Sequence, residues 1–139
     1  MERAPERMTF PPDGTSRWAG MADLVLVSPG DRHEVTLLYV GEPPHGDSYH
    51  CAEIDGAPLP GWVWGGNFAF TPDGTHLACS WMAVRFERRT IVIDLAGRCY
   101  CVLPRVFVDF EFRGPDLIGC GSAAGLEHRF AGSERWKRF

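Results

Sequence analysis

Residues 68–78 read Phe68-Ala69-Phe70-Thr71-Pro72-Asp73-Gly74-Thr75-His76-Leu77-Ala78. Apolar residues run up to a Pro-Asp-Gly turn and leave it again, and these turn residues favour the tight backbone bend that joins two strands. Forty-three positions earlier the chain repeats the pattern with Gly and Asp exchanged, as Leu24-Val25-Leu26-Val27-Ser28-Pro29-Gly30-Asp31. A pattern that recurs about every forty residues indicates a repeated unit of several short strands. The stretch therefore predicts a β scaffold that binds through its loops.

Hydrophobic residues alternate with a period of two, which indicates strands rather than helices. The clearest case is 106–113, where one face is expected to carry Val106, Val108, Phe110 and Phe112. Further short strands are expected at about 22–28, 34–41, 48–54, 66–71, 76–83, 90–95, 99–103, 116–121 and 126–130. No helix is expected, because the best place for one, 131–139, is too short to form alone.

Units of this pattern can be drawn at about 22–64, 67–104 and 106–130. The second is the most regular, because after its turn it continues with Ile91-Val92-Ile93-Asp94-Leu95-Ala96-Gly97, a strand that ends in an acidic tight turn. It resembles a blade of the Pro-Asp-Gly type of β-propeller, a relative of WD repeats. The resemblance implies four-stranded antiparallel blades that form a scaffold and carry no catalytic residues. About two to three blades are too few to close a ring. The expected fold is therefore all-β, with antiparallel meander sheets resembling an incomplete β-propeller or an open β-sandwich.

The length of 139 residues suits one domain, expected over 18–139 and preceded by a flexible N-terminal arm over 1–17. The net charge of −4 argues against a general nucleic-acid-binding protein, which is usually basic. The charged start lacks the apolar core of a signal peptide, and no apolar run reaches the roughly 20 residues of a membrane helix. We therefore expect a cytoplasmic protein that binds neither nucleic acid nor membrane.

The cysteines are odd in number, fall in or beside apolar strands, and show no disulfide pattern. They are Cys51, Cys79, Cys99, Cys101 and Cys120. We expect buried free thiols in a reducing compartment. Cys99 and Cys101 share a strand face, so a zinc site with His50 and Cys51 is an alternative, but the close-set ligand pairs of such sites are missing. The expectation is core packing, with no metal or cofactor.

Asp109 and Glu111 lie two positions apart on the polar face of the strand expected at 106–113. Paired carboxylates can exchange protons, bind a cation or attract a basic partner. The alternative is a solvated strand face, which the alternation already predicts. Both residues are candidates for partner binding, and no residue is assigned a catalytic role.

Successive turns of a meander alternate between the two ends of a sheet. The Pro-Asp/Gly turns should lie at one end, the turn end, and loops 41–48 and 84–89 at the other, joined by the crossover 60–66. This second group, the loop end, is rich in Trp and Arg, which are enriched at interface hot spots. The candidate partner-binding residues are Trp62, Trp64, Arg85, Phe86, Arg88, Arg89, Glu42, Asp47, Asp109 and Glu111. The alternative is a solvated charged hairpin over buried tryptophans.

These features predict a non-enzymatic domain that binds a protein partner. A small, acidic, single-domain and apparently bacterial protein of this kind suits a toxin-neutralising immunity protein, which masks a toxin through one surface. Arg88→Glu or Trp64→Ala should then weaken the complex with little loss of fold. One alternative is a truncated propeller scaffold that self-associates as a homo-oligomer or docks in a larger assembly. Another is a metal- or carboxylate-dependent enzyme using Cys99, Cys101, Asp109 and Glu111.

Overall fold

The computed structural model describes residues 5–44 and 46–139. Within these ranges the only helices are two single-turn 3-10 helices, η1 (Pro29–Asp31) and η2 (Gly121–Ala123). The prediction of an all-β fold with open, mostly antiparallel sheets is therefore confirmed. The strands are β1 (Glu6–Thr9), β2 (Ser16–Trp18), β3 (Leu24–Val27), β4 (Glu34–Gly41), β5 (Tyr49–Ile54), β6 (Ala57–Pro58), β7 (Trp62–Phe70), β8 (His76–Met82), β9 (Arg89–Asp94), β10 (Cys99–Val102), β11 (Phe110–Arg113), β12 (Asp116–Gly119), β13 (Glu127–His128) and β14 (Trp136–Arg138).

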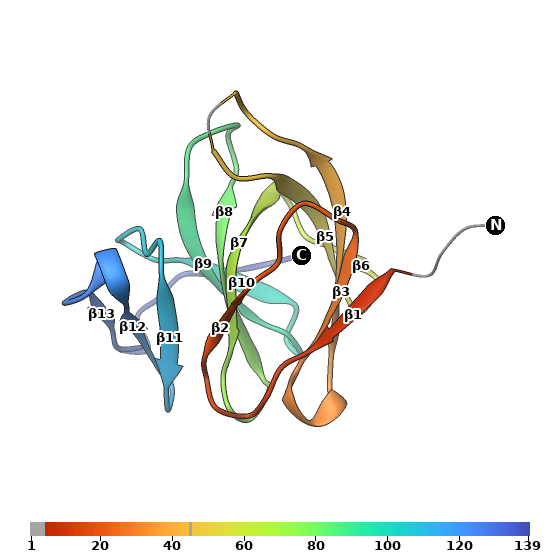
Figure 1. Ribbon diagram of the computed structural model, residues 1–139. Helices are drawn as coiled ribbons and strands as arrows, with labels where there is room; N and C mark the ends of the chain where they lie inside the picture. The colour runs from red at the N-terminus through yellow and green to blue at the C-terminus, as the bar shows by residue number, and fades with distance from the viewer. Residues whose placement is uncertain (1–4, 45) are drawn as a thin grey trace.

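The larger sheet runs in the order β1-β3-β4-β5-β7-β8-β9-β10-β14, and from β3 to β10 it is an antiparallel meander (Figure 1). The shortest pairing between neighbouring strands of this order is that of β5 with β7, where Tyr49 pairs with Trp64 and His50 with Val63. Outside this short pairing, β6 pairs with Glu53 and Ile54 at the end of β5, and β2 pairs with residues 67–69 of β7. The sheet therefore opens into two sides, β3–β5 and β7–β10.

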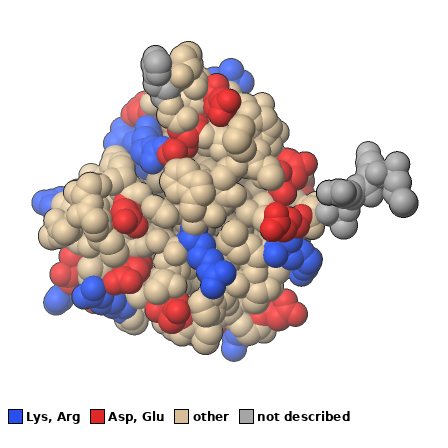
Figure 2. Space-filling view, in the orientation of Figure 1, with Lys and Arg blue, Asp and Glu red and all other residues tan. Residues whose placement is uncertain are grey.

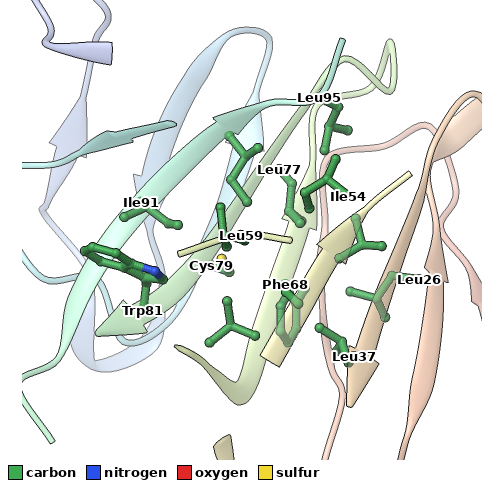
Figure 3. Packing of buried hydrophobic residues seen from close by; sticks show 14 of the residues in the cluster. Leu26, Leu37, Ile54, Leu59, Phe68, Leu77, Cys79, Trp81, Ile91 and Leu95 are labelled. Atoms are coloured by element: carbon green, nitrogen blue, oxygen red, sulfur yellow. The ribbon is translucent and has the colours of Figure 1, made fainter. Parts of the chain in front are cut away.

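One hydrophobic core fills the space between these two sides. Figure 3 shows core side chains from β3–β5, namely Leu26, Leu37 and Ile54, near core side chains from β7–β9, namely Phe68, Leu77 and Ile91. Leu59, in the connection from β6 to β7, is buried in the same cluster. Burying these apolar side chains contributes roughly 1.5–3 kcal/mol for each one, so this core holds the open sheet together.

The smaller sheet, β11–β13, packs on the opposite face of β7–β10, beside them in Figure 1. Its aromatic side chains, Phe110 and Phe112, meet a row of small residues that crosses four paired strands: Ala69, Ala78, Val92 and Cys101. Small side chains in register leave room for the rings to approach the backbone closely. Both faces of β7–β10 are therefore buried, which explains why these strands are apolar almost throughout.

The strand expected at 106–113 is only half formed, because β11 begins at Phe110. Phe107 is buried whereas Val106 and Val108 are exposed, the reverse of the predicted faces. The Phe107 amide donates to the buried Thr90 Oγ1 at 2.8 Å, which fixes this segment as a connection between the two sheets. The alternation then changes phase at Asp109, and Phe110 and Phe112 point inward as expected.

The flexible arm predicted for 1–17 is wrong for residues 6–17. The strand β1 pairs in parallel with β3, Phe10 is buried against Phe70, and β2 pairs with β7. Residues 1–4 lie outside the described residues. Sequence alone favoured an arm because β1 and β2 are edge segments with exposed, polar side chains, and their partners lie far away in the chain.

The C-terminal segment supplies an edge strand instead of the short helix considered for it. The strand β14 pairs with β10, and the Phe139 amide donates to the Arg98 carbonyl oxygen at 3.0 Å. The two edges of the larger sheet are thus β1 and β14, which are four and three residues long and rich in charged side chains. Short, charged edges discourage pairing with another chain.

Candidate functional site

The turns separate into two ends, as the meander predicts. At the turn end, shown low in Figure 1, a β-carbon on Gly74 would lie 2.4 Å from the Pro29 carbonyl oxygen, so the turns at Pro29 and Pro72 are in contact. At the loop end, shown high in Figure 1, the β4–β5 and β8–β9 loops meet through an ion pair of 2.7 Å between Arg88 and Asp47. His45, also in the predicted loop, lies outside the described residues.

A small aromatic cluster underlies the loop end, separate from the main core. Tyr49, Trp64 and Met82 are buried in it, and Trp62 is half-buried beside them. Phe86, from the β8–β9 loop, covers the cluster with its ring 6.0 Å from the Tyr49 ring and 6.5 Å from the Trp64 ring. Alternation along β7 explains the arrangement, because the residue between the two tryptophans, Val63, points into the main core.

Two arginines lie over the tryptophans of this cluster. The Arg88 guanidinium is 4.7 Å from the Trp64 ring centroid, and the Arg85 guanidinium is 5.4 Å from the Trp62 ring centroid. Each arrangement is within the range of a cation–π interaction, worth roughly 0.5–1 kcal/mol at exposed sites. The predicted residues of the crossover and of the β8–β9 loop are therefore brought together.

Two of the predicted binding residues are mainly structural. Trp64 is only 5% exposed, and its Nε1 is buried with no hydrogen-bond partner in the described part of the chain. Arg88 is held by its ion pair and by the Trp64 ring. From these contacts we expect Trp64→Ala and Arg88→Glu to affect the fold as well as binding, since each removes or reverses a contact within the loop end.

Phe86 is the most unusual residue of the loop end. Its side chain is 53% exposed, and its backbone has a φ of +68°, a left-handed conformation that is costly for an aromatic residue. Its amide donates to the Met82 Sδ at 3.0 Å, which anchors the loop onto the cluster. Strained backbone conformations persist where the surroundings enforce them, and they concentrate at functional sites.

A shallow hollow of about 200 Å³ adjoins this cluster, and sequence reasoning missed most of it. Its wall is formed by Trp18, which is 57% exposed, with Met21, Glu42 and Asp47. A β-carbon on Gly65 would lie 2.1 Å from the Gly20 carbonyl oxygen, so a glycine in β7 lets this N-terminal segment approach closely. The available signal was the Gly65-Gly66 pair, which marks a close backbone approach within a strand.

The remaining charged candidates lie at the margin of the loop end or away from it. Arg89 pairs with Glu87 at 2.6 Å on the exposed start of β9. Asp109 accepts a long, 3.5 Å hydrogen bond from Asn67 of β7, and Glu111 pairs with Arg113 on its own strand at 2.9 Å. Among the described residues, no hydrogen bond or ion pair joins Asp109 or Glu111 to the two loops. The pair is therefore not part of the loop end.

Within residues 5–44 and 46–139, no group of three or more His, Cys, Asp or Glu side chains is arranged to hold a metal ion. The cysteines are all free, and Cys79 and Cys101 are buried, whereas Cys51 is exposed, contrary to expectation. Burial raises the pKa of the Cys101 thiol to about 11 and raises those of Cys99 and Cys120 as well. Nucleophilic cysteines and metal-bound cysteines need the thiolate, which these surroundings disfavour.

Acidic and basic side chains are interspersed on the face seen in Figure 2, without a large field of either sign. In the portion of the chain that the structure describes, no helix is long and apolar enough to cross a membrane. Comparisons with protein-family models, with curated proteins and with solved structures found no match to this chain.

Proposed function

We propose that this chain is a protein-binding domain, not an enzyme, and that it binds its partner through the loop end. The observation that carries the proposal is Phe86, an aromatic side chain presented to solvent from a left-handed backbone conformation. Folding gains little from such a residue, because the ring is half exposed and the backbone is strained. A partner that buries the ring would gain the roughly 25 cal/mol per Å² of apolar burial.

The surroundings of Phe86 have the composition of an interface. Exposed Val84 and Arg85 neighbour it in the same loop, and Trp62 lies half-buried under Arg85. On the other side, Arg88 and Asp47 connect it to the hollow beside Trp18. Exposed aromatic and arginine side chains above a rigid buried cluster are the usual anchors of protein interfaces.

The partner that we favour is a toxin domain, which would make the chain an immunity protein of the cytoplasm. The supporting features are its length of 139 residues and its net charge of −4. The acidic net charge would speed association with a partner that has a basic surface, whereas the loop end itself offers charges of both signs, since Arg88 lies beside Asp47 and Arg89 beside Glu87. This choice rests on the class of protein, whereas the choice of surface rests on Phe86.

The experiment is co-expression with the protein encoded by the adjacent gene, followed by light scattering for stoichiometry and calorimetry for affinity. We expect a one-to-one complex that Phe86→Ala and Arg85→Glu each weaken by about tenfold or more, as interface anchors do. Val106→Ala is the control, because Val106 is an exposed apolar residue of the β10–β11 connection, outside the β4–β5 and β8–β9 loops. Wild-type affinity in both loop-end variants would refute the proposed surface.

A second arm tests the surface without assuming a partner. A photo-crosslinking amino acid is placed at position 86 or, as control, at position 106, and the crosslinked products from cells are compared. Products common to both positions, or absent at 86, count against the loop end. Protection of cells from the toxin tests the immunity function separately, and failure to protect despite tight binding would leave a protein-binding domain of another kind.

The alternative of a self-associating propeller fragment has less support. Such a fragment should offer a long open strand edge, whereas β1 and β14 are short and charged. Light scattering of the purified protein distinguishes the two, because a stable homo-oligomer would favour the scaffold.

A further inference from the structure

The turn end carries a cavity that the proposed function does not use. It has a volume of about 530 Å³ and lies where three segments meet: the β7–β8 turn, the β11–β12 turn and the stretch before β14. Small-molecule sites commonly occupy about 300–1,000 Å³ between structural units. The cavity therefore has the size and the position of a ligand site, at the opposite end of the sheet from Phe86.

The walls of the cavity are mainly apolar and aromatic. Pro72 and Pro115 come from the two turns, and the buried Phe112 of β11 also lines the cavity. Phe130 and Trp136 come from the C-terminal segment, with their rings stacked at a centroid distance of 6.2 Å. Trp136 remains 38% exposed, so part of the ring is available to a ligand.

The charged groups that line the cavity are acidic, namely Asp73 and Glu134, and none of its lining residues is Lys or Arg. Arg135 and Lys137 flank Trp136 in the chain, but neighbouring residues of a strand point to opposite faces and neither of them lines the cavity. Hydrogen bonds lower the pKa of Asp73 to about 2, so the carboxylate is ionised at neutral pH. The cavity thus disfavours anions and favours cations.

The two carboxylates differ in what they can still accept. Glu134 accepts hydrogen bonds from the Ala131 and Gly132 amides at 3.0 Å, and it contacts His128 Nε2 at 3.1 Å. Both of its carboxylate oxygens therefore already bind groups of its own loop. Asp73 Oδ1 accepts from Thr71 and Thr75, but within the described residues Asp73 Oδ2 forms no hydrogen bond. Asp73 is therefore the carboxylate that retains an acceptor.

His76 adds a second acceptor beside Asp73. The Thr75 hydroxyl donates to Asp73 Oδ1 at 2.7 Å, and His76 Nδ1 contacts the same hydroxyl oxygen at 2.7 Å. Since the Thr75 proton is already used, His76 Nδ1 must be the donor in this contact. The neutral His76 ring then carries its lone pair on Nε2, and the residue lines the cavity.

We propose that the cavity binds a small organic cation with an apolar body, of the arylalkylamine type. The ammonium group would be held by Asp73 and His76, in charge-assisted hydrogen bonds. The apolar body packs against Phe130 and Trp136, and the Trp136 face adds a cation–π contact when the ammonium lies over it.

The test is a series of three probes of matched shape, titrated by calorimetry: phenethylamine, 2-phenylethanol and 3-phenylpropionate. We expect the amine to bind, the neutral alcohol to bind at least about tenfold more weakly, and the anion not to bind. Backbone NMR shifts should place the amine at residues 71–76 and 130–136. The proposal fails if the alcohol or the anion binds as well as the amine, if no probe binds, or if the shifts map elsewhere.

Variants then test the roles of the side chains. Asp73→Asn keeps an oxygen for Thr71 and Thr75 but removes the charge, so amine affinity should fall about tenfold while alcohol affinity is unchanged. The matched control is Asp13→Asn, because Asp13 makes the same hydrogen bonds to Thr15 in its own Pro-Asp-Gly turn and does not line the cavity. Equal losses in the two variants would contradict the role of Asp73. Trp136→Ala should weaken both the amine and the alcohol.

Discussion

Gly14 offers the sharpest test of the observed architecture, because it joins the N-terminal segment to the smaller sheet. It adopts a φ of +78°, and a β-carbon at this position would lie 2.2 Å from the Phe112 carbonyl oxygen. The Gly14 carbonyl oxygen in turn accepts a hydrogen bond of 2.8 Å from the Phe112 amide. In Gly14→Ala, the left-handed backbone costs about 1 kcal/mol, the lost hydrogen bond about 1 kcal/mol, and the displaced strand roughly 1–2 kcal/mol.

The expected loss of unfolding free energy is therefore about 3–4 kcal/mol, which for this length lowers the Tm by roughly 10 °C. The control is Gly56→Ala, because Gly56 has a similar φ of +85° but no atom within 4 Å of its β-carbon position. That variant should lose only about 1 kcal/mol. Denaturant unfolding of both variants measures the difference. If Gly14→Ala loses no more unfolding free energy than Gly56→Ala, the close contact between Gly14 and Phe112 is refuted, and the N-terminal segment is then not fixed to the smaller sheet.

Four further outcomes are expected. Trp64→Ala should cost about 3–5 kcal/mol of stability, as for other buried aromatic residues, and an unfolding midpoint like that of wild type would place Trp64 at the surface. Phe86→Gly should be more stable than Phe86→Ala by about 1 kcal/mol, because glycine relieves the left-handed backbone; the usual order, with alanine more stable, would disprove the strain. Burial lowers the pKa of His50, so the folded state resists protonation and the unfolding free energy should fall as the pH drops below about 6.5. In His50→Gln the unfolding free energy should depend less on pH between pH 7 and 5, and an unchanged dependence would exclude His50 as its source. Deleting residues 1–10 should uncover the β3 edge and cause concentration-dependent association in light scattering, whereas a stable monomer would show that β1 does not protect this edge.

The strands and turns of the central units could be predicted from sequence because their signals are local. Pro and Gly mark the turns at Pro29 and Pro72, and the alternation of β4 and β11 reports one buried face. The edge strands could not be found in this way. Every residue of β14 is exposed, so no hydrophobic pattern marks it, and its pairing with β10 joins residues more than thirty positions apart.

The sequence predicted which loops make up the candidate site, but not which of its side chains are buried and which are exposed. Trp62 and Trp64 share one strand face, so sequence could place them together, but it could not tell which one is covered. The cover is Phe86, which comes from a loop about twenty residues further along the chain. The hollow beside Trp18 was missed for a related reason: residues 1–17 were predicted to be a flexible arm, so the strand β2, which ends at Trp18, was not expected.

The N-terminal segment explains how an open arrangement of sheets holds together without closing. Within residues 6–18 it pairs with β3 through β1, inserts Phe10 against Phe70 at a ring distance of 4.8 Å, and pairs with β7 through β2. Between these contacts, Gly14 is hydrogen-bonded to Phe112 of the smaller sheet. One short segment therefore contacts β3–β5, β7–β10 and β11–β13. In a closed propeller, each sheet would instead be held by the sheets on either side of it. The contact through Gly14 lies beside Phe112 at the turn end, whereas Phe86, with its positive φ and exposed ring, lies at the loop end. The segment that connects the strand groups is therefore separate from the surface proposed to bind the protein partner.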